Sequence, residues 1–288
     1  MSLPFPFAVV ASVAGITVEC RTDDPETARC FAEIVPPTAP LSGSPRHIYD
    51  IRRAADGNLL VTTDTLHLGH TPHPGNAVAA IEFDVKRAAE TYHPESLWLH
   101  AAGLAREDGS ALLCIGASGA GKSTASLALL GAGWRYLADD AVLLDPVDRE
   151  LVGLGWPLRL ADIPETLTVA GFAIASDKRI ASSEGMTLKY RLTPPPDLVW
   201  NGTRPARLDR CLFLERGSLA LEPLSPGQAL LRLWPRRIPR SDGREPWEPG
   251  ALAARLAGVQ FAVLRTERID QLVPAVAGWI EEKRGSSR

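Results

Sequence analysis

The chain has 288 residues, of which 45% are hydrophobic and 23% are charged, and its formal net charge is −3. This composition excludes wholesale disorder and leaves enough apolar residues for one large core or two smaller ones. A slightly acidic chain is not expected to bind mainly to nucleic acid, although a single nucleotide needs only a few local donors.

The N-terminal stretch lacks the features of a secretion signal. No basic residue precedes its short apolar run, and Pro4 and Pro6 interrupt it. No run in the chain reaches the roughly 18–20 apolar residues of a membrane span. The cysteines form no CxxC pair, which is typical of free thiols in a reducing compartment. These are Cys20, Cys30, Cys114 and Cys211. We therefore expect a cytoplasmic protein that binds neither a membrane nor nucleic acid.

Residues 1–95 are predicted to form a small α+β region that consists mostly of strands and loops. Residues 7–20 have the composition of strands. Two β-type runs, at 47–52 and 58–63, flank an Ala-Asp-Gly turn, which predicts a hairpin. The proline-rich residues 36–45 are expected to form a loop.

A helix is predicted at the end of this first region, over residues 76–92. Its apolar residues Val78, Ile81 and Val85 recur at helical spacing, with charged residues between them. Asn76 can serve as the N-cap, and the His-Pro pair that follows residue 92 ends the helix.

A second region starts near residue 97 and has the order strand, loop, helix, strand. Residues 97–105 predict one strand, 111–118 a buried strand, and 124–130 a helix that is followed by a further strand region at 134–145. This order is typical of an α/β nucleotide-binding domain, which we expect to cover residues 96–288.

The rest of this domain alternates strands, loops and helices. A polar, proline-rich stretch at 176–205 precedes a predicted strand at 211–217. Ser225 and Pro226 suit the N-cap and the first turn of a helix. The C-terminal part predicts a helix, a strand and a helix, at 251–256, 259–264 and 269–282.

A glycine-rich motif, GASGAGKST, joins the buried strand to its helix and meets the pattern GxxxxGK[ST]. Glycines let the backbone turn several N–H groups onto phosphate oxygens, and the helix points its N-terminal dipole at the same place. In this pattern Lys122 reaches the β- and γ-phosphates, and the Ser123 hydroxyl ligates Mg²⁺. We expect a nucleoside triphosphate to bind here. The expected binding residues are Gly116, Ala117, Ser118, Gly119, Ala120, Gly121, Lys122, Ser123 and Thr124.

Two carboxylates, Asp139 and Asp140, follow the helix at the end of the next predicted strand. In P-loop proteins a carboxylate on a neighbouring strand approaches the metal and the attacking group. One of the two could act as general base toward a hydroxyl, while the other holds the magnesium shell. Successive side chains on a strand point to opposite faces, so both reach one site only if the strand ends or bends there. A solvated turn is the alternative interpretation.

His100 lies on the predicted strand that precedes the loop strand. A lone histidine on an apolar strand is more often a core residue than a functional one. If the two strands are neighbours, however, His100 lies close to the acid pair, and an imidazole there could orient or tune a catalytic carboxylate.

Together these residues resemble the catalytic domain of HPr kinase/phosphorylase and its shorter relatives. The resemblance rests on the order LWLHAAG, GASGAGKST and GWRYLADDAV within residues 97–145, and residues 211–231 also look like a segment of the shorter relatives. It implies a P-loop domain of the phosphoenolpyruvate carboxykinase type, with a small β-rich N-terminal region. It also implies ATP- and Mg²⁺-dependent phosphorylation of a serine in a protein or peptide, such as a lasso-peptide precursor.

The resemblance also implies a role for each site residue. Lys122 would bind the β- and γ-phosphates, and Ser123 would ligate Mg²⁺. Asp139 would be the base that takes the serine proton, Asp140 would support it or the metal, and His100 would orient the pair. Members of the family often assemble, so a homo-oligomer is expected.

Glu150 marks a departure from the family pattern. The bifunctional enzymes carry a Glu-x-Arg-Gly-x-Gly signature well downstream of the acid pair. Here the nearest echo begins at Glu150, close behind Asp140, and Val152 stands where the arginine would be. Glu150 is thus a candidate for a second metal contact, whereas phosphorylase activity and HPr as the substrate are not implied.

Two groups of basic residues could clamp phosphates or an acidic peptide, as mobile loops do in phosphoryl transfer. The first group, around an SSEG segment, contains Lys178, Arg179, Lys189 and Arg191. The second, in a proline-rich loop, contains Arg236, Arg237, Arg240 and Arg244. Solvated surface charge is the alternative interpretation of both groups.

Three functions stay open at this stage. The first is a serine kinase that acts on a protein or peptide. The second keeps the chemistry but uses a small-molecule hydroxyl or amine as acceptor, which a deep pocket beside the acid pair would favour. The third is a nucleotide-binding regulator with little turnover, which would not need a base at the acceptor position.

Overall fold

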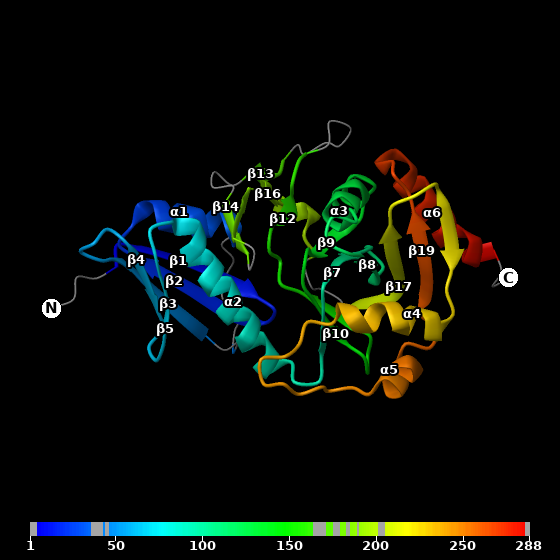
Figure 1. The fold of residues 1–288 in the computed structure, drawn as a ribbon, viewed down its shortest axis with the longest axis horizontal. Coiled ribbons are helices and arrows are strands. Elements are labelled where there is room, and N and C mark those ends of the chain that lie inside the picture. The colour runs from blue at the N-terminus through cyan, green and yellow to red at the C-terminus, as the bar shows by residue number, and fades with distance from the viewer. Residues whose placement is uncertain are drawn as a thin grey trace. The chain divides into compact units, whose positions relative to one another are not determined.

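The computed structural model describes residues 5–35, 43, 46–163, 171–174, 179–182, 185–188, 190–200 and 205–285. The chain forms two compact units (Figure 1). The first comprises Met1–Pro94, Gly155–Asp162 and Phe172–Thr193, and the second comprises Glu95–Leu154, Ile163–Gly171 and Pro194–Arg288. Two later segments therefore join the N-terminal stretch in the first unit. The division into domains at residue 95 stays a prediction.

A five-stranded sheet with two helices forms most of the first unit. Its elements are β1 (Phe7–Val13), β2 (Ile16–Thr22), α1 (Pro25–Ile34), β3 (Arg46–Arg53), β4 (Leu59–Thr62), β5 (His67–Thr71) and α2 (Pro74–Tyr92). The strand order is β1-β2-β3-β4-β5, and only β2 and β3 are parallel. The predicted β-type runs are therefore strands, and the hairpin between β3 and β4 is confirmed. The predicted loop at 36–45 falls, apart from Gly43, outside the described residues.

The two helices of this unit begin differently from the prediction. The sequence pattern does not predict α1, although Asp24 accepts a 2.8 Å hydrogen bond from the Thr27 amide and so caps the helix. A helical crossover is what two parallel neighbours such as β2 and β3 need. The prediction of Asn76 as the cap of α2 is wrong. The helix begins at Pro74, with His73 at the N-cap position, because the fixed φ of proline suits a first turn.

Two small sheets complete the first unit. One contains β12 (Leu158–Leu160), β16 (Tyr190–Thr193) and β13 (Ala173–Ile174), and the other pairs β14 (Arg179–Ser182) with β15 (Gly185–Leu188). Arg191 on β16 is only 1% exposed, so both interpretations of it, a mobile clamp and a solvated charge, are wrong. Lys178, Lys189 and the side chain of Arg179 lie outside the described residues.

The second unit is built on a nine-stranded mixed sheet. Its strands are β6 (Leu97–Leu99), β7 (Ala101–Ala105), β8 (Ser110–Ile115), β9 (Arg135–Ala138), β10 (Val142–Asp145), β11 (Glu150–Gly153), β17 (Ala206–Glu215), β18 (Ala220–Pro223) and β19 (Gln260–Arg265). The order is β6-β10-β11-β17-β8-β7-β9, and β19 lies between β17 and β18. The pairs β8–β17 and β17–β19 are parallel.

Helices cover both faces of this sheet. They are α3 (Lys122–Gly131), α4 (Pro226–Leu233), α5 (Pro249–Arg255) and α6 (Ile269–Gly285), with short 3₁₀ turns at Pro196–Leu198 and Trp234–Arg236. Leu113 and Ile115 of β8 share a core with Leu233 and Leu252 from the region of α4 and α5. The alternate side chains of β8 point to the other face, where α3 packs on β7, β8 and β9 and contacts α6 (Figure 1). The unit is therefore mixed α/β, as predicted.

The strand predicted over residues 97–105 is interrupted at His100, so its prediction as one strand is wrong. The part before His100, β6, pairs with β10, and the part after it, β7, pairs with β8 and β9. The region 134–145 is interrupted too, at residues 139–141, where Asp140 adopts a left-handed φ of 74°. The strand thus ends and bends at the acid pair, which is the condition for both carboxylates to reach one site.

The two interruptions lie opposite each other. Leu99 pairs with Val142 on one side of them, and Gly103 pairs with Ala138 on the other side. The sheet folds tightly here, because a Cβ atom added to Gly153 of β11 would clash with the carbonyl oxygen of Leu137. This arrangement brings a histidine of one strand region beside the carboxylates of another.

All four cysteines are buried and free, as predicted, and each unit contains two of them. Cys20 and Cys30 lie in the first unit, and Cys114 and Cys211 lie on neighbouring strands of the second. Burial raises the pKa of Cys20 and of Cys114 to about 12 and that of Cys211 well above its ordinary value, so these thiols are unreactive in the folded chain.

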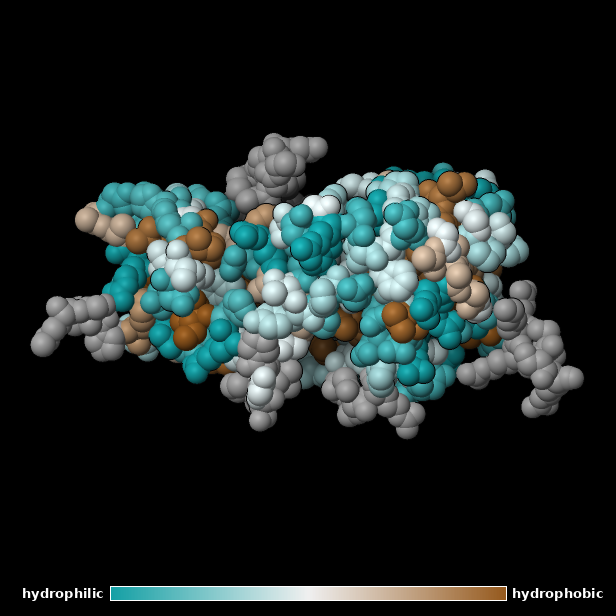
Figure 2. Space-filling view, turned by 90° about the horizontal axis from the view of Figure 1, so that it is seen from below, coloured by the Kyte–Doolittle hydropathy of each residue, from teal (hydrophilic) through white to brown (hydrophobic). Residues whose placement is uncertain are grey.

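The surface is mainly hydrophilic on the face that Figure 2 shows, and its hydrophobic residues form small separate groups. Among the described residues, no helix combines the length and the apolar character that crossing a membrane requires.

Candidate functional site

The glycine-rich loop connects β8 to α3, as the motif predicts. Gly119 and Gly121 have φ angles of 76° and 96°, which side chains other than glycine rarely adopt. Gly116 is needed for space, since an added Cβ atom would lie 2.8 Å from the Cβ of Ala120. Helix α3 begins at Lys122, two residues before the predicted start, and no side chain caps it. Its first N–H groups therefore face the loop, where an anion can accept from them.

Lys122 lies inside this loop and is only 8% exposed. Its ammonium group donates to the carbonyl oxygens of Gly116 at 3.0 Å and Ala117 at 3.4 Å. Its Nζ also lies 3.1 Å from Nε2 of His100. The lysine is thus held by the backbone of the loop, at the place where a bound phosphate would meet its charge.

Ser123, the next residue, donates a 2.7 Å hydrogen bond to Oδ2 of Asp139. Asp139 directly follows β9 and is 2% exposed. A hydroxyl and a carboxylate in contact provide the hard oxygen ligands that Mg²⁺ prefers, so the two residues suit a magnesium ion beside the loop. In the described part of the chain, no three His, Cys, Asp or Glu side chains gather to hold a metal on their own.

His100 connects the lysine to the second carboxylate. Its Nδ1 lies 3.0 Å from Oδ1 of Asp140, and both side chains are 36% exposed. With a proton on Nδ1 facing the carboxylate, the other ring nitrogen is free to accept from the Lys122 ammonium. Asp140 has a left-handed φ of 74°, and the preceding Asp139 is buried. The five predicted polar residues thus form two contacting sets, Lys122–His100–Asp140 and the more buried Ser123–Asp139, which are joined through neighbouring residues of the chain.

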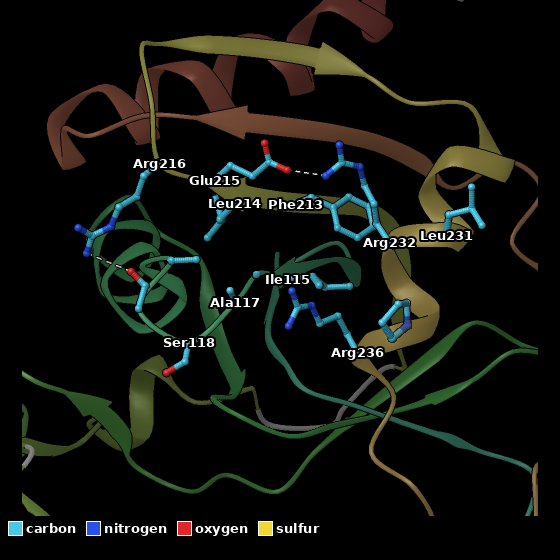
Figure 3. A pocket seen from close by; sticks show the side chains of 14 residues that line it. Ile115, Ala117, Ser118, Phe213, Leu214, Glu215, Arg216, Leu231, Arg232 and Arg236 are labelled. Carbon is cyan, nitrogen blue, oxygen red and sulfur yellow. Dashed lines mark hydrogen bonds and ion pairs between the residues drawn. The ribbon is translucent and has the colours of Figure 1, made fainter.

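A cavity of about 550 Å³ borders the loop on the side of β17 (Figure 3). It is lined by the loop and by the carboxyl end of β17, together with α4 and the 3₁₀ turn that follows it. Arg216 donates to the carbonyl oxygen of Gly119 at 3.1 Å, and Arg232 pairs with Glu215. These contacts fix the loop and the wall of the cavity to one strand.

Arg236 is the third arginine of this cavity, and it is half-buried. Its guanidinium points into the cavity in Figure 3, and it makes no ion pair with any carboxylate in the described residues. Its carbonyl oxygen accepts from the His100 amide at 2.8 Å, so the backbone ties it to His100. The sequence groups Arg236 with three other arginines of a proline-rich loop as a candidate phosphate clamp, but it does not single Arg236 out as the one that lines this cavity.

The structure does not bring Glu150 to this group. Glu150 begins β11 and pairs with Arg207, which in turn pairs with Ser110 at the amino end of β8. The loop follows the other end of β8, roughly 16 Å away at 3.3 Å per residue. The prediction that Glu150 makes a second metal contact in this site is therefore wrong.

No family model matches the chain, and no curated protein matches its sequence. Among solved structures, the HPr(Ser) kinase/phosphatase from Coxiella burnetii is similar to this chain over 66% of its length and 96% of that chain. The identity is 15% and the TM-score 0.31. A similarity this distant assigns no family, so any role for the site rests on its own residues.

Proposed function

We propose that the chain is an ATP- and Mg²⁺-dependent kinase that phosphorylates a serine hydroxyl of a protein or peptide. One observation carries the proposal: the loop residues Lys122 and Ser123 contact an imidazole and a carboxylate within 3.1 Å. A phosphate loop alone would suit an ATPase, a GTPase or a regulator equally. The connected acid–imidazole group supplies the base that transfer to a hydroxyl needs.

The buried side of the group suits the nucleotide and its metal. The loop amides and Lys122 would bind the β- and γ-phosphates. Ser123 and Asp139 would hold Mg²⁺, as a loop serine and a strand carboxylate do in P-loop enzymes. When bound, the ion neutralises charge that develops on the transferred phosphoryl group.

The more exposed side suits the acceptor. Asp140 is 36% exposed and is held by His100, so it can meet an incoming hydroxyl and take its proton. Asp139 is 2% exposed and already bonded to Ser123, which limits its reach. We therefore assign the base to Asp140 and the metal to Asp139, which reverses the division implied by the sequence resemblance.

The cavity beside the loop suits the nucleoside. The acid pair joins β9 to β10 and does not line the cavity, which lies between the loop and the end of β17. If the γ-phosphate faces the acid pair, the base and ribose can extend into this cavity. Phe213 and Leu231 offer apolar surface there, and Arg236 is placed to meet phosphate charge.

An acceptor that approaches from solvent fits this geometry better than an enclosed small molecule. None of His100, Asp139 and Asp140 lines the cavity beside the loop. The Asp140–His100 pair, which is partly exposed, therefore supports a protein or peptide as the acceptor. A small-molecule acceptor is the second candidate, and a regulator with little turnover is the third.

The direct test is to incubate the purified chain with Mg²⁺, ATP and synthetic peptides that match small open reading frames beside its gene. Mass spectrometry should find one phosphate on a serine of one peptide, and no phosphate when Asp140→Asn replaces the native chain. Tight ATP binding without transfer to any peptide would support a regulator instead. Consumption of ATP with a phosphorylated metabolite would support the small-molecule kinase.

A further inference from the structure

A second charged pocket lies at the other end of the strands that carry the loop. It has a volume of about 530 Å³, which lies in the range of small-molecule sites. Its lining comes from the β7–β8 turn, the β10–β11 turn, the start of β17 and helix α6. We call it the arginine pocket, after Arg106, Arg149, Arg207 and Arg210.

Three of these arginines lack a carboxylate partner in the described part of the chain. Arg106 lies over the Trp134 ring at 5.9 Å, and Arg149 donates to the carbonyl oxygen of Ala257 at 3.5 Å. Arg207 is exposed. Only Arg210, which is 8% exposed, forms an ion pair, with Asp209.

Backbone hydrogen bonds keep the segments that carry these arginines next to each other. The Arg207 amide donates to the carbonyl oxygen of Gly109, and the Leu208 amide donates to that of Arg149. Arg149 itself adopts a left-handed φ of 59°, a conformation that costs energy for a residue with a side chain. Gly109 also has a positive φ, and a Cβ atom there would lie 3.1 Å from the Pro205 carbonyl oxygen.

Like charges at one pocket repel each other, and arginine does not relieve the repulsion by losing its proton. The four arginines and the two aspartates of the lining, Asp108 and Asp209, leave a net charge of +2. The guanidinium fork matches phosphate oxygens two at a time. A phosphate monoester carries a charge of about −2 near neutral pH, so it fits the pocket in charge and in hydrogen bonding.

We propose that the arginine pocket is a second anion site, which binds inorganic phosphate or the phosphate group of a small phosphomonoester. It differs in kind from the glycine-rich loop, because it uses side-chain guanidiniums instead of backbone amides and no carboxylate–imidazole group adjoins it. It is a binding site without a reaction of its own. The proposal does not rest on the kinase proposal, since the two sites share no residue.

The test must separate this pocket from the loop, which is also expected to bind phosphate. Inorganic phosphate is titrated into the full-length Lys122→Ala chain by calorimetry, with the loop weakened. One saturable site is expected to remain. In the same background, Arg149→Gln with Arg207→Gln should weaken it about tenfold or more, because each change removes a charged hydrogen-bond donor. Arg268→Gln, which removes an exposed charge paired with Asp270, is the control and should leave binding unchanged.

Two further titrations decide the ligand class. Glycerol 3-phosphate should bind as inorganic phosphate does or more tightly, and succinate, a dianion of another shape, should bind more weakly. Equal binding of succinate would overturn the phosphate assignment. No saturable phosphate binding in the Lys122→Ala chain would overturn the site itself, and so would binding that survives the double arginine change. Circular dichroism and the melting temperature establish that the variants are folded.

Discussion

The carboxyl and amino ends of strands β8 and β17 carry different sets of charged groups. At the carboxyl end, a backbone loop and one buried lysine adjoin two carboxylates and a histidine. At the amino end, four arginines gather around a pocket in which one aspartate is already paired. The carboxyl end thus joins a glycine-rich loop to groups that can move a proton, whereas at the amino end arginines outnumber the two aspartates and no histidine is among the lining residues. Under the two proposals, a site that reacts with a bound phosphate needs a base beside it, and a site that only binds phosphate does not.

The largest expected effect is that of Lys122→Ala at the carboxyl end. Because a preorganised positive charge is removed from the developing phosphoryl group, phosphoryl transfer should fall by about 10²–10³-fold. ATP affinity, measured by calorimetry, should fall as well. Lys86→Ala in the first unit is the matched control. Unchanged ATP affinity and activity in Lys122→Ala would contradict the proposed role of the loop. The carboxyl end of the strands would then have no proposed reaction to distinguish it from the amino end.

The carboxylates are expected to separate into two roles. Asp140→Asn should lower kcat by about 10²–10⁴-fold with ATP affinity kept, since it removes the general base. Asp139→Asn should mainly raise the Mg²⁺ concentration that half-maximal activity needs, because it weakens the Ser123–Asp139 pair. Steady-state kinetics over a range of Mg²⁺ distinguishes the two. If Asp139→Asn is inactive at saturating Mg²⁺ and Asp140→Asn is not, the base is Asp139.

Two adjacent arginines offer a finer comparison. Arg236 lines the cavity and pairs with no carboxylate of the described segments, whereas Arg237 pairs with Glu245 and its guanidinium carbon lies 3.3 Å from the centre of the Trp234 ring. Arg236→Ala should therefore lower kcat/KM for ATP about tenfold, the size of one charged hydrogen bond. Arg237→Ala should act through stability, and its melting temperature should fall with less effect on kcat/KM per folded molecule. Equal effects of the two substitutions on kcat/KM for ATP would contradict a direct role of Arg236 in nucleotide binding.

The smallest effect concerns Glu215 at the carboxyl end of β17. The hydrogen bond from Arg232, with help from Arg265, lowers the pKa of Glu215 below 4.5 despite partial burial, which raises it. A lowered folded-state pKa gives stability that is present above pH 4.5 and lost as the pH falls through the folded value. Glu215→Gln should thus cost less than about 1 kcal/mol at neutral pH, because the pair is partly exposed.

Urea unfolding at a series of pH values measures this loss. The two chains should become equally stable well below pH 4.5, the unperturbed value for this carboxyl. Glu267→Gln, an exposed change in the same unit, provides the baseline. A difference between Glu215→Gln and the native chain that persists in acid would show that the side chain acts by packing and not by its charge.

Much of the local structure around the loop was predictable. The glycines, Lys122 and the apolar run before them fix the order strand, loop, helix, and Ser225 with Pro226 predicts α4, where a capping box is observed. Local patterns suffice here because each signal lies within a few residues of the structure it predicts.

The break at His100 was not predictable in the same way. The residues around it are continuously apolar, and the strand divides because its two halves find different partners, β10 and β9. The arginine pocket was even less predictable from the sequence. Its lining comes from four separate segments of the chain, so no stretch of sequence contains the pattern. Such features belong to tertiary pairing, which periodicity and spacing do not report.

The reactivity of the buried cysteines can report local unfolding in each of the two units. Only a thiolate reacts quickly with an alkylating reagent, and burial keeps the pKa of Cys20, Cys114 and Cys211 far above neutrality. Modification must therefore wait for a transient local opening of the strand that holds the thiol. Because two cysteines lie in each unit, alkylation rates measured for the individual cysteine peptides would give the rate of local opening in each unit separately. A nucleotide that binds the loop next to Cys114 should slow the alkylation of the cysteines in the second unit and leave the alkylation rates in the first unit unchanged.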